Sequence, residues 1–297
     1  MNRREYIMKH MKKLALLGLT AVMSLSLLAG CGGTTGNAET PDAGETTPAT
    51  ESQAPAGETT PAAGEFTTVE AGKLHMSTNA AFPPYEMIKD DGTFEGIDVE
   101  VAGAIAEKLG LELVVDDMGF DAALLAAQNG QSDIVMAGVT VTDERLEVMD
   151  FSESYATGVQ VIIVKEDSPI QTVDDLANAD MIGTQKATTG YIYCSDTVEN
   201  GGYGEDHVTG YESGAVAIQA LLNGQVDAVV IDSAPAQEFV AANEGLKILD
   251  TEFAVEDYAI GVKKGNTALL DAINGALAEL IEDGTVQSIV DKYITAG

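Results

Sequence analysis

Two segments 94 residues apart share one pattern, and this repeat limits the possible fold more than any other feature of the sequence. Residues 125–138 read LAAQNGQSDIVMAG, and residues 219–232 read QALLNGQVDAVVID. Each segment predicts the end of a helix, an Asn-Gly-Gln-x-Asp turn and a buried strand. A repeated supersecondary unit favours two similar α/β lobes over one undivided domain.

The sequence around the repeat alternates between predicted strands and helices. Strand 73–77 precedes a helix that begins at Asp98. Strand 111–115 precedes helix 122–128, for which Asp121 is the expected N-cap. Further strands are expected at 159–164, 181–184, 226–231, 247–249 and 258–262, and further helices at 173–177, 215–222, 236–242, 269–281 and 286–294. This order predicts an α/β protein with mostly parallel sheets and right-handed crossovers.

The composition excludes several classes of partner and of scaffold. The chain has 297 residues and a formal net charge of −33. Nucleic acid and anionic membrane surfaces are poor partners for such a charge. The two cysteines, Cys31 and Cys194, are too few for a disulfide framework. Cys194 is expected to be a packed bystander rather than a nucleophile, because no histidine stands near it in the sequence.

The first 30 residues have the form of a bacterial export signal. Two arginines and three lysines precede an apolar run, residues 14–28, which is shorter than a typical membrane span. The tetrapeptide Leu-Ala-Gly-Cys at 28–31 resembles the lipobox, at which signal cleavage precedes a lipid-modified cysteine. We therefore expect residues 1–30 to be a lipoprotein signal peptide and Cys31 to carry palmitate. An uncleaved anchor or an ordinary secretory signal is the alternative.

Residues 31–66 have the composition of a tether. Glycine, threonine, alanine, proline and glutamate dominate the segment without an apolar period, so it cannot bury a core. A flexible coil of about 34 residues spans roughly 30–35 Å. We expect a disordered linker that holds a globular body away from a membrane.

A polar stretch, residues 195–213, is expected to be irregular surface. Its glycines Gly201, Gly202 and Gly204 lack the preceding strand and the following Gly-Lys-Ser/Thr of a phosphate loop. Its acidic residues do not have the spacing of an EF-hand. The sequence therefore predicts neither a metal site nor a cofactor.

A candidate anion site follows the first copy of the repeated strand. Thr142 is the expected N-cap of an acidic helix, and Arg145 lies in the first turn of that helix. A helix start offers unpaired N–H groups, and a guanidinium offers a planar pair of donors that matches a carboxylate. The residues indicate a carboxylate receiver. The alternative is an ordinary capped helix with a solvated arginine.

The repeat gives this anion site a counterpart. In the register of the two copies, Gly138 and Asp232 occupy equivalent strand ends. Ligands of open α/β sheets bind beyond the carboxyl ends of the strands. We therefore expect Thr140 and Arg145 of one lobe to face a cleft shared with Asp232 of the other. The alternative role for Asp232 is that of a helix N-cap before Pro235.

Together these motifs resemble the solute-binding proteins of polar amino acid ABC importers, over about residues 70–296. The matching pieces are residues 78–86 (TNAAFPPYE), 96–99 (GIDV), Phe120, 138–145 (GVTVTDER), 150–152 (DFS), 185–190 (QKATTG) and 226–232 (VDAVVID). The resemblance implies two α/β lobes, each a mostly parallel sheet flanked by helices, joined by two hinge strands and closing over one amino acid. It assigns residues 67–157 and 258–297 to lobe 1 and residues 158–257 to lobe 2.

The resemblance also implies a role for each of nine residues. Arg145 would bind the α-carboxylate of the ligand, assisted by Thr140 and by Thr189 of the other lobe. The Gly138 carbonyl and the Asp232 carboxylate would bind the α-ammonium group. The other four would enclose the ligand side chain (Phe82 and Phe120) or lie near its tip (Asn79 and Gln185).

Two positions depart from the family pattern. Asn79 stands where many relatives have aspartate, which weakens the expectation of a cationic ligand side chain. Ala187 replaces a common glycine. Glutamine, cystine, arginine and lysine all remain open as ligands. Phe82 and Phe120 could instead belong to the core.

The function implied by the resemblance is amino acid capture outside the cytoplasm. A monomeric, lipid-anchored protein on the extracytoplasmic face of the cell membrane would deliver a free polar amino acid to the permease of an ABC importer. No catalytic activity, cofactor or nucleic acid is expected. Two alternatives stay open, a dehydratase-like enzyme on the same fold and a sensory receptor module. An enzyme would consume its ligand, whereas a binding protein would not.

Overall fold

The computed structural model describes residues 66–294. The expected signal peptide, the lipidation site at Cys31 and the tether up to residue 65 lie outside the described residues. Within residues 66–294, none of the helices combines the length and the apolar composition that a membrane crossing needs.

A sheet of nine strands runs through the described residues, and a small sheet of three strands lies apart from it. The large sheet has the order β5-β1-β6-β12-β7-β10-β8-β9, with β11 paired to β7. Its strands are β1 (Lys73–Thr78), β5 (Glu112–Asp117), β6 (Ile134–Val135), β7 (Met149–Lys165), β8 (Ile182–Gln185), β9 (Val208–Tyr211), β10 (Ala228–Asp232), β11 (Leu246–Ile248) and β12 (Ala254–Lys263). The small sheet contains β2 (Ala81–Phe82), β3 (Glu86–Ile88) and β4 (Phe94–Glu95).

The helices alternate with the strands along the chain. The α-helices are α2 (Ile97–Lys108), α3 (Phe120–Asn129), α4 (Asp143–Val148), α5 (Thr189–Ser195), α6 (Gly214–Leu222), α7 (Ser233–Ala242), α8 (Thr267–Glu282) and α9 (Thr285–Tyr293). Short 3-10 helices cover η1 (Val173–Asn178), η2 (Val198–Asn200) and η3 (Glu205–His207). The predicted α/β class is confirmed.

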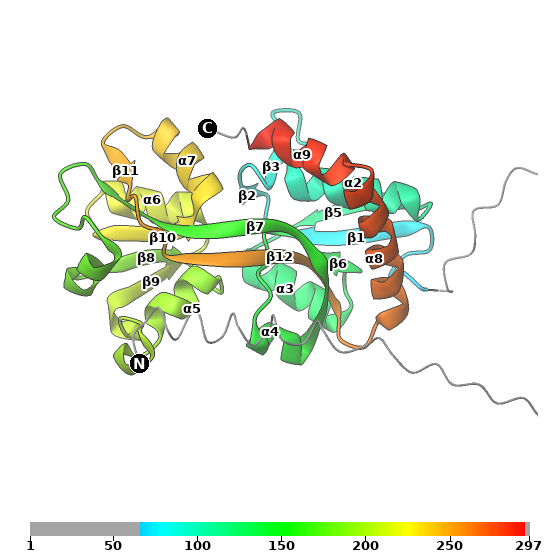
Figure 1. Ribbon diagram of the computed structural model, residues 1–297, viewed down its shortest axis with the longest axis horizontal. Helices are drawn as coiled ribbons and strands as arrows, with labels where there is room; N and C mark the ends of the chain where they lie inside the picture. Colours follow the sequence, from blue (N-terminus) through cyan, green and yellow to red (C-terminus); the bar gives the residue numbers. More distant parts are fainter. Residues whose placement is uncertain (1–65, 295–297) are drawn as a thin grey trace, which may run out of the picture. The chain divides into compact units, whose positions relative to one another are not determined.

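The long strands β7 and β12 run antiparallel, side by side, and connect two parallel halves of the sheet (Figure 1). Strands β5, β1 and β6 pair in parallel on one side of this crossing pair. Strands β10, β8 and β9 pair in parallel on the other side. The predicted two-lobed fold with two hinge strands is therefore confirmed. The lobe boundaries after residues 157 and 257 fall within β7 and β12, and they stay a prediction.

The two copies of the sequence repeat fold alike. Gly130 ends α3 and Gly224 follows α6, both in the left-handed conformation that glycine adopts without strain. The equivalent residues Asp133 and Asp227 each accept two backbone N–H hydrogen bonds of 2.7–3.2 Å. The donors are Val69 and His75 for Asp133, and Asp180 and Met181 for Asp227. The strands that follow, β6 and β10, flank the crossing pair from opposite sides.

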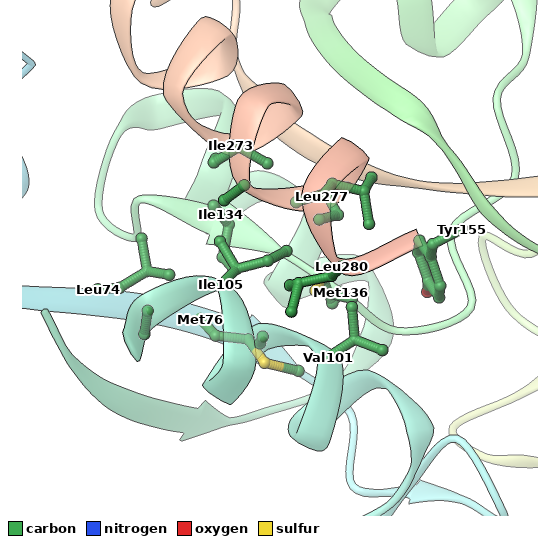
Figure 2. Close-up of a cluster of buried hydrophobic side chains, with 14 of the residues drawn as sticks. Leu74, Met76, Val101, Ile105, Ile134, Met136, Tyr155, Ile273, Leu277 and Leu280 are labelled. Carbon is green, nitrogen blue, oxygen red and sulfur yellow. The ribbon is translucent and has the colours of Figure 1, made fainter. Parts of the chain in front are cut away.

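Each lobe has its own buried apolar core. In one lobe, side chains of α8 pack against α2 and against the strands beneath (Figure 2). The side chains labelled there are Leu74, Met76, Val101, Ile105, Ile134, Met136, Tyr155, Ile273, Leu277 and Leu280. In the other lobe, apolar clusters cover both faces of β10. Cys194 is fully buried in one of these clusters, as expected for a packed residue.

Two local predictions were wrong. Residues 195–213 were expected to be irregular, but they contain β9, a short strand at the edge of the sheet that is paired on one side only and has one buried residue. Asp121 was expected to be the N-cap of helix α3. The helix instead begins at Phe120 with Gly119 at the N-cap, and Asp121 lies within its first turn. The Asp121 carboxylate instead lies 3.1 Å from the Lys186 ammonium of the other lobe.

Helix α8 offers a matched pair of isoleucines that tests the assigned core. Ile273 is 0% exposed and Ile281 is 48% exposed. Ile273→Ala should lower the free energy of unfolding by about 2–4 kcal/mol, since it opens a cavity in the core. Ile281→Ala should lower it by less than about 1 kcal/mol. Urea denaturation followed by circular dichroism measures both, and equal losses would contradict the assignment.

Candidate functional site

A cavity lies between the lobes and encloses about 460 Å³ of space not filled by protein atoms, part of it open to solvent. All nine residues predicted from the sequence line it. They are Asn79, Phe82, Phe120, Gly138, Thr140, Arg145, Gln185, Thr189 and Asp232. Further lining residues are Glu86, Ala137, Gln160, Thr188, Val230, Ile231 and Tyr258.

The loop after β6 is held on the hinge strand β12. Thr140 forms an antiparallel bridge with Tyr258. The Val141 N–H donates to the Asp257 carbonyl at 3.2 Å, and the Ala259 N–H donates to the Val139 carbonyl at 3.1 Å. Backbone pairing thus fixes Thr140 against the strand that connects the two lobes.

Arg145 is a buried cation whose position is set by two carbonyl groups. Its side chain is 7% exposed, and Thr142 caps the helix that carries it, as predicted. One guanidinium nitrogen donates to the Thr140 carbonyl at 2.7 Å, and the other terminal nitrogen donates to the Ala187 carbonyl of the other lobe at 3.0 Å. The guanidinium carbon lies 5.6 Å from the centre of the Phe120 ring. A solvated arginine, the alternative considered above, is excluded.

Ala187 adopts a backbone conformation that is unfavourable for alanine. Its φ of +61° lies in the left-handed region, which is unfavourable by roughly 1–2 kcal/mol for a residue with a Cβ. Glycine adopts this region freely, which gives a physical reason for the glycine expected there in relatives. The strained backbone turns the Ala187 carbonyl toward Arg145.

Asp232 combines both of the roles considered for it. Its side chain accepts the Ala234 N–H at 3.0 Å as the N-cap of α7. The other carboxylate oxygen accepts the Val159 N–H at 2.8 Å and the Tyr258 hydroxyl at 2.9 Å. Burial raises the pKa of Asp232 to about 6, against the effect of these hydrogen bonds. The helix cap and the cavity lining therefore use the same carboxylate.

Gly138 is held by a second buried acid. Its φ is +55°, and a Cβ there would approach the Phe82 ring to 3.0 Å. Its N–H donates to Asp98 at 2.8 Å, and the Tyr155 hydroxyl donates to the same carboxylate at 2.7 Å. Burial raises the pKa of Asp98 to about 6. The turn that presents the Gly138 carbonyl thus depends on glycine and on Asp98.

Two amides and two aromatic rings also line the cavity. The Gln185 amide donates to the Asn79 side-chain oxygen at 2.9 Å, which links the two lobes. The Asn79 amide donates to the Met118 carbonyl at 2.9 Å. Phe120 also packs in a core cluster, so the core alternative applies to it in part. Phe82 packs partly buried against core clusters of both lobes.

The sequence patterns did not identify three residues on the crossing strands, Glu256, Tyr258 and Gln160, nor the acid Glu86. Glu256 and Tyr258 lie on the buried face of β12, and Gln160 lies on β7. The alternation of buried and exposed residues at 254–258 is the signal that could have found Glu256, since it places this acid on the inner face.

Glu86 is the remaining acid of the cavity. It is fully buried, and its carboxyl group lies within hydrogen-bonding reach of the Asp98 carboxylate. Burial and the charge of Asp98 raise the pKa of Glu86 well above its ordinary value. A neutral carboxylic acid at this position follows.

No group of three or more acids, histidines or cysteines within residues 66–294 has the geometry of a metal site. The acids of the 195–213 stretch are included in this finding. The cavity itself carries the positive charge of Arg145 on one side and the acid Asp232 on another.

Comparison with known proteins identifies close relatives of this chain. The family described as bacterial extracellular solute-binding proteins, family 3, matches residues 74–296. A probable histidine-binding protein of Neisseria gonorrhoeae is 33% identical over 226 residues, which are 75% of this chain and 83% of that protein. An ancestral arginine-binding protein was solved bound to glutamine and bound to arginine. Both structures are 37% identical with a TM-score of 0.69, covering 76% and 75% of this chain and 100% and 98% of theirs.

The raised pKa of Asp232 predicts a pH dependence of stability. An acid whose pKa is higher in the folded protein than in the unfolded chain stabilises the fold at low pH, and this contribution is lost as the pH rises through about 6. Thermal unfolding should therefore show higher stability at pH 5 than at pH 7.5. Asp232→Asn should reduce that difference by on the order of 1 kcal/mol, because asparagine remains a good N-cap.

The matched control for this pH dependence is Asp271→Asn, an exposed acid of α8. It should leave the difference between the two pH values nearly unchanged. A wild-type slope retained in Asp232→Asn would show that this carboxyl does not titrate near pH 6.

Proposed function

Because this chain belongs to the bacterial extracellular solute-binding proteins, family 3, we propose that it captures a free polar amino acid between its two lobes. The observation that carries the proposal is the pairing of Arg145 and Asp232 around one cavity. The residues arrive there from opposite lobes. A molecule with a carboxylate and an ammonium group meets one fixed cation and one fixed anion.

The energetics of the cavity support this ligand class. Charge-assisted hydrogen bonds contribute about 1.5–3 kcal/mol each. Three or four of them, with burial against Phe82 and Phe120, are sufficient for micromolar binding at about −8 kcal/mol after the costs of association. In the proposed complex, Arg145 holds the α-carboxylate, and Thr140 and Thr189 lie beside it. Asp232 and the Gly138 carbonyl hold the α-ammonium group, which requires Asp232 to be ionised.

The side-chain end of the cavity supports a polar ligand. Asn79 and Gln185 present amides there rather than carboxylates. The names of the relatives, which include histidine, arginine and glutamine as ligands, belong to the same polar class. Glutamine suits the two amides best, because its side chain both donates and accepts hydrogen bonds.

A binding role without catalysis is favoured over an enzyme by the same relatives, which are named for binding. The proposed role includes delivery of the bound amino acid to the permease of an ABC importer. A sensory receptor module is the second candidate, and co-purification with a permease would distinguish the two. In both cases the bound amino acid is recovered unchanged.

Calorimetry with the twenty free amino acids tests the proposed function. We expect tight binding of a polar amino acid by the wild type. Arg145→Ala should weaken it at least 100-fold, since two charge-assisted hydrogen bonds to the carboxylate are lost. Arg145→Lys should bind with intermediate affinity, because it keeps the charge but not the planar fork.

The control for these variants is Lys108→Ala, which removes a cation of the same lobe that pairs with Glu279 outside the cavity. Its affinity should stay within twofold of the wild type. Thermal unfolding without ligand checks that the Arg145 variants are folded. Wild-type affinity in folded Arg145→Ala would refute the site.

The location of the protein is a further part of the proposal and rests on the sequence of residues 1–31. We place the protein on the extracytoplasmic face of the cell membrane, held by a lipid on Cys31. Labelled palmitate should enter the wild-type protein in cells, and the protein should sediment with membranes. The Cys31→Ser variant should take up no label and should no longer sediment with the membranes. A labelled, sedimenting Cys31→Ser variant would contradict the anchor.

A further inference from the structure

Glu256 gathers hydrogen bonds from three parts of the fold on a single oxygen atom. Its Oε2 accepts the hydroxyl of Thr140 at 2.9 Å, the hydroxyl of Thr189 at 2.9 Å and the amide of Gln160 at 3.3 Å. Thr140 belongs to the loop after β6, Thr189 begins α5 of the other lobe, and Gln160 lies on the hinge strand β7. The side chain of Glu256 is 5% exposed.

The two threonine bonds differ in what they connect. Thr140 is already fixed to β12 by the backbone pairing of its loop, so it moves with Glu256. Thr189 lies on α5, which packs on β8 and β9 of the other lobe. The Thr189 bond to Glu256 therefore joins the second lobe to the hinge strand. Glu256 thus connects Thr140 of one lobe and Thr189 of the other through a single oxygen atom.

Each threonine hydroxyl can donate only one hydrogen bond. Each hydroxyl has one proton to donate, and both protons go to Glu256. In this arrangement neither threonine has a hydroxyl proton left for a ligand carboxylate. Their effect on a ligand is then exerted through position, whereas Arg145 keeps N–H donors beyond the two that its carbonyl partners take.

Several polar and charged groups surround the buried Glu256. Burial raises its pKa, and the hydrogen bonds from Thr189, Thr140 and Gln160 and the charge of Arg145 act in the opposite direction. Burial raises the pKa values of Tyr193 of α5 and Tyr258 of β12, and the Glu256 charge adds to the effect on both. Asp232 is the other acid whose pKa the Glu256 charge raises. The Tyr193 hydroxyl also lies within hydrogen-bonding reach of the Glu256 carboxylate, so α5 approaches this acid with two side chains.

We propose that Glu256 is a positioning residue that couples lobe closure to ligand capture, by tying Thr189 of the second lobe to the hinge strand beside Arg145. This inference rests on the proposed function. The tie forms only when the lobes are together, so it stabilises the closed state and slows release of the ligand. The threonines act through Glu256 and not as direct hydroxyl donors to the ligand.

A double-mutant cycle between Thr189→Val and Glu256→Leu tests the tie. The probe is the amino acid that the wild type binds most tightly in the panel of twenty, beginning with L-glutamine and L-arginine. Thr189→Val alone should weaken binding about 5- to 10-fold, as expected for the net contribution of one typical intramolecular hydrogen bond. In the Glu256→Leu background the same change should have less than a twofold effect, because its partner is already absent.

Thr188→Val is the matched control for the cycle. Thr188 is the neighbouring residue and also lines the cavity, but its hydroxyl donates to the Gln185 carbonyl. Its effect on affinity should multiply with that of Glu256→Leu, without coupling. Glu256→Gln serves as a second variant, since it keeps the side-chain volume and one acceptor oxygen, and it guards against misfolding of the leucine variant.

Kinetics separate a closure tie from a general structural role. The chain has no tryptophan, so stopped-flow tyrosine fluorescence measures the rates. Glu256→Gln and Thr189→Val should speed dissociation about 5- to 10-fold and change the association rate less than twofold. A loss carried mainly by the association rate would overturn the inference.

The remaining outcomes are also decisive. An equal effect of Thr189→Val in both Glu256 backgrounds would show that the hydroxyl contacts the ligand directly, and would overturn the tie. A wild type that binds none of the twenty amino acids would refute the proposed function itself. A wild type that binds, with no coupling in the cycle, would refute only the role of Glu256.

Discussion

A buried guanidinium is the constraint on which this molecule depends. Arg145 is the single arginine of the sequence after residue 4, and it lies inside a strongly acidic protein rather than on its surface. Arginine does not lose its proton in proteins, so its desolvation has to be offset by partners. Thr140, Ala187 and the Phe120 ring provide them, and Glu256 supplies an opposite charge. Both lobes are thus arranged around one cation.

The acids at the cavity are also held in place by hydrogen bonds within the protein. Asp232 caps α7, receives the Tyr258 hydroxyl and still faces the cavity. Asp98 accepts the Gly138 N–H and so fixes the turn at Gly138. Because these carboxylates serve the backbone as well as the cavity, their orientations are fixed before any ligand arrives. Such preorganisation lowers the cost of binding.

The sequence predicted the parts of the site that are carried by local patterns. The repeat predicted both strand ends at the cavity, and the capped helix start at Thr142 predicted the position of Arg145. Glu256 was missed because strand β12 was expected to begin at Tyr258, which left the acid outside the strand. Its role depends on the register of β12 against β7, where Glu256 pairs with Gly158, and long-range register is not a local property. Strand β9 was missed because an edge strand with little burial carries a weak pattern.

The continuity of β7 sets how the protein can be divided. This strand of 17 residues pairs with β12 along one part and with β10 and β11 along the other. The lobe that contains β1 is completed by the chain that returns through β12 into α8. The half that contains β1 is therefore not a continuous module, and a cut after β7 separates its sheet from β12 and α8. Replacing one lobe by another would thus require two new chain junctions, one in β7 and one in β12, whereas the residues around the cavity can change one at a time.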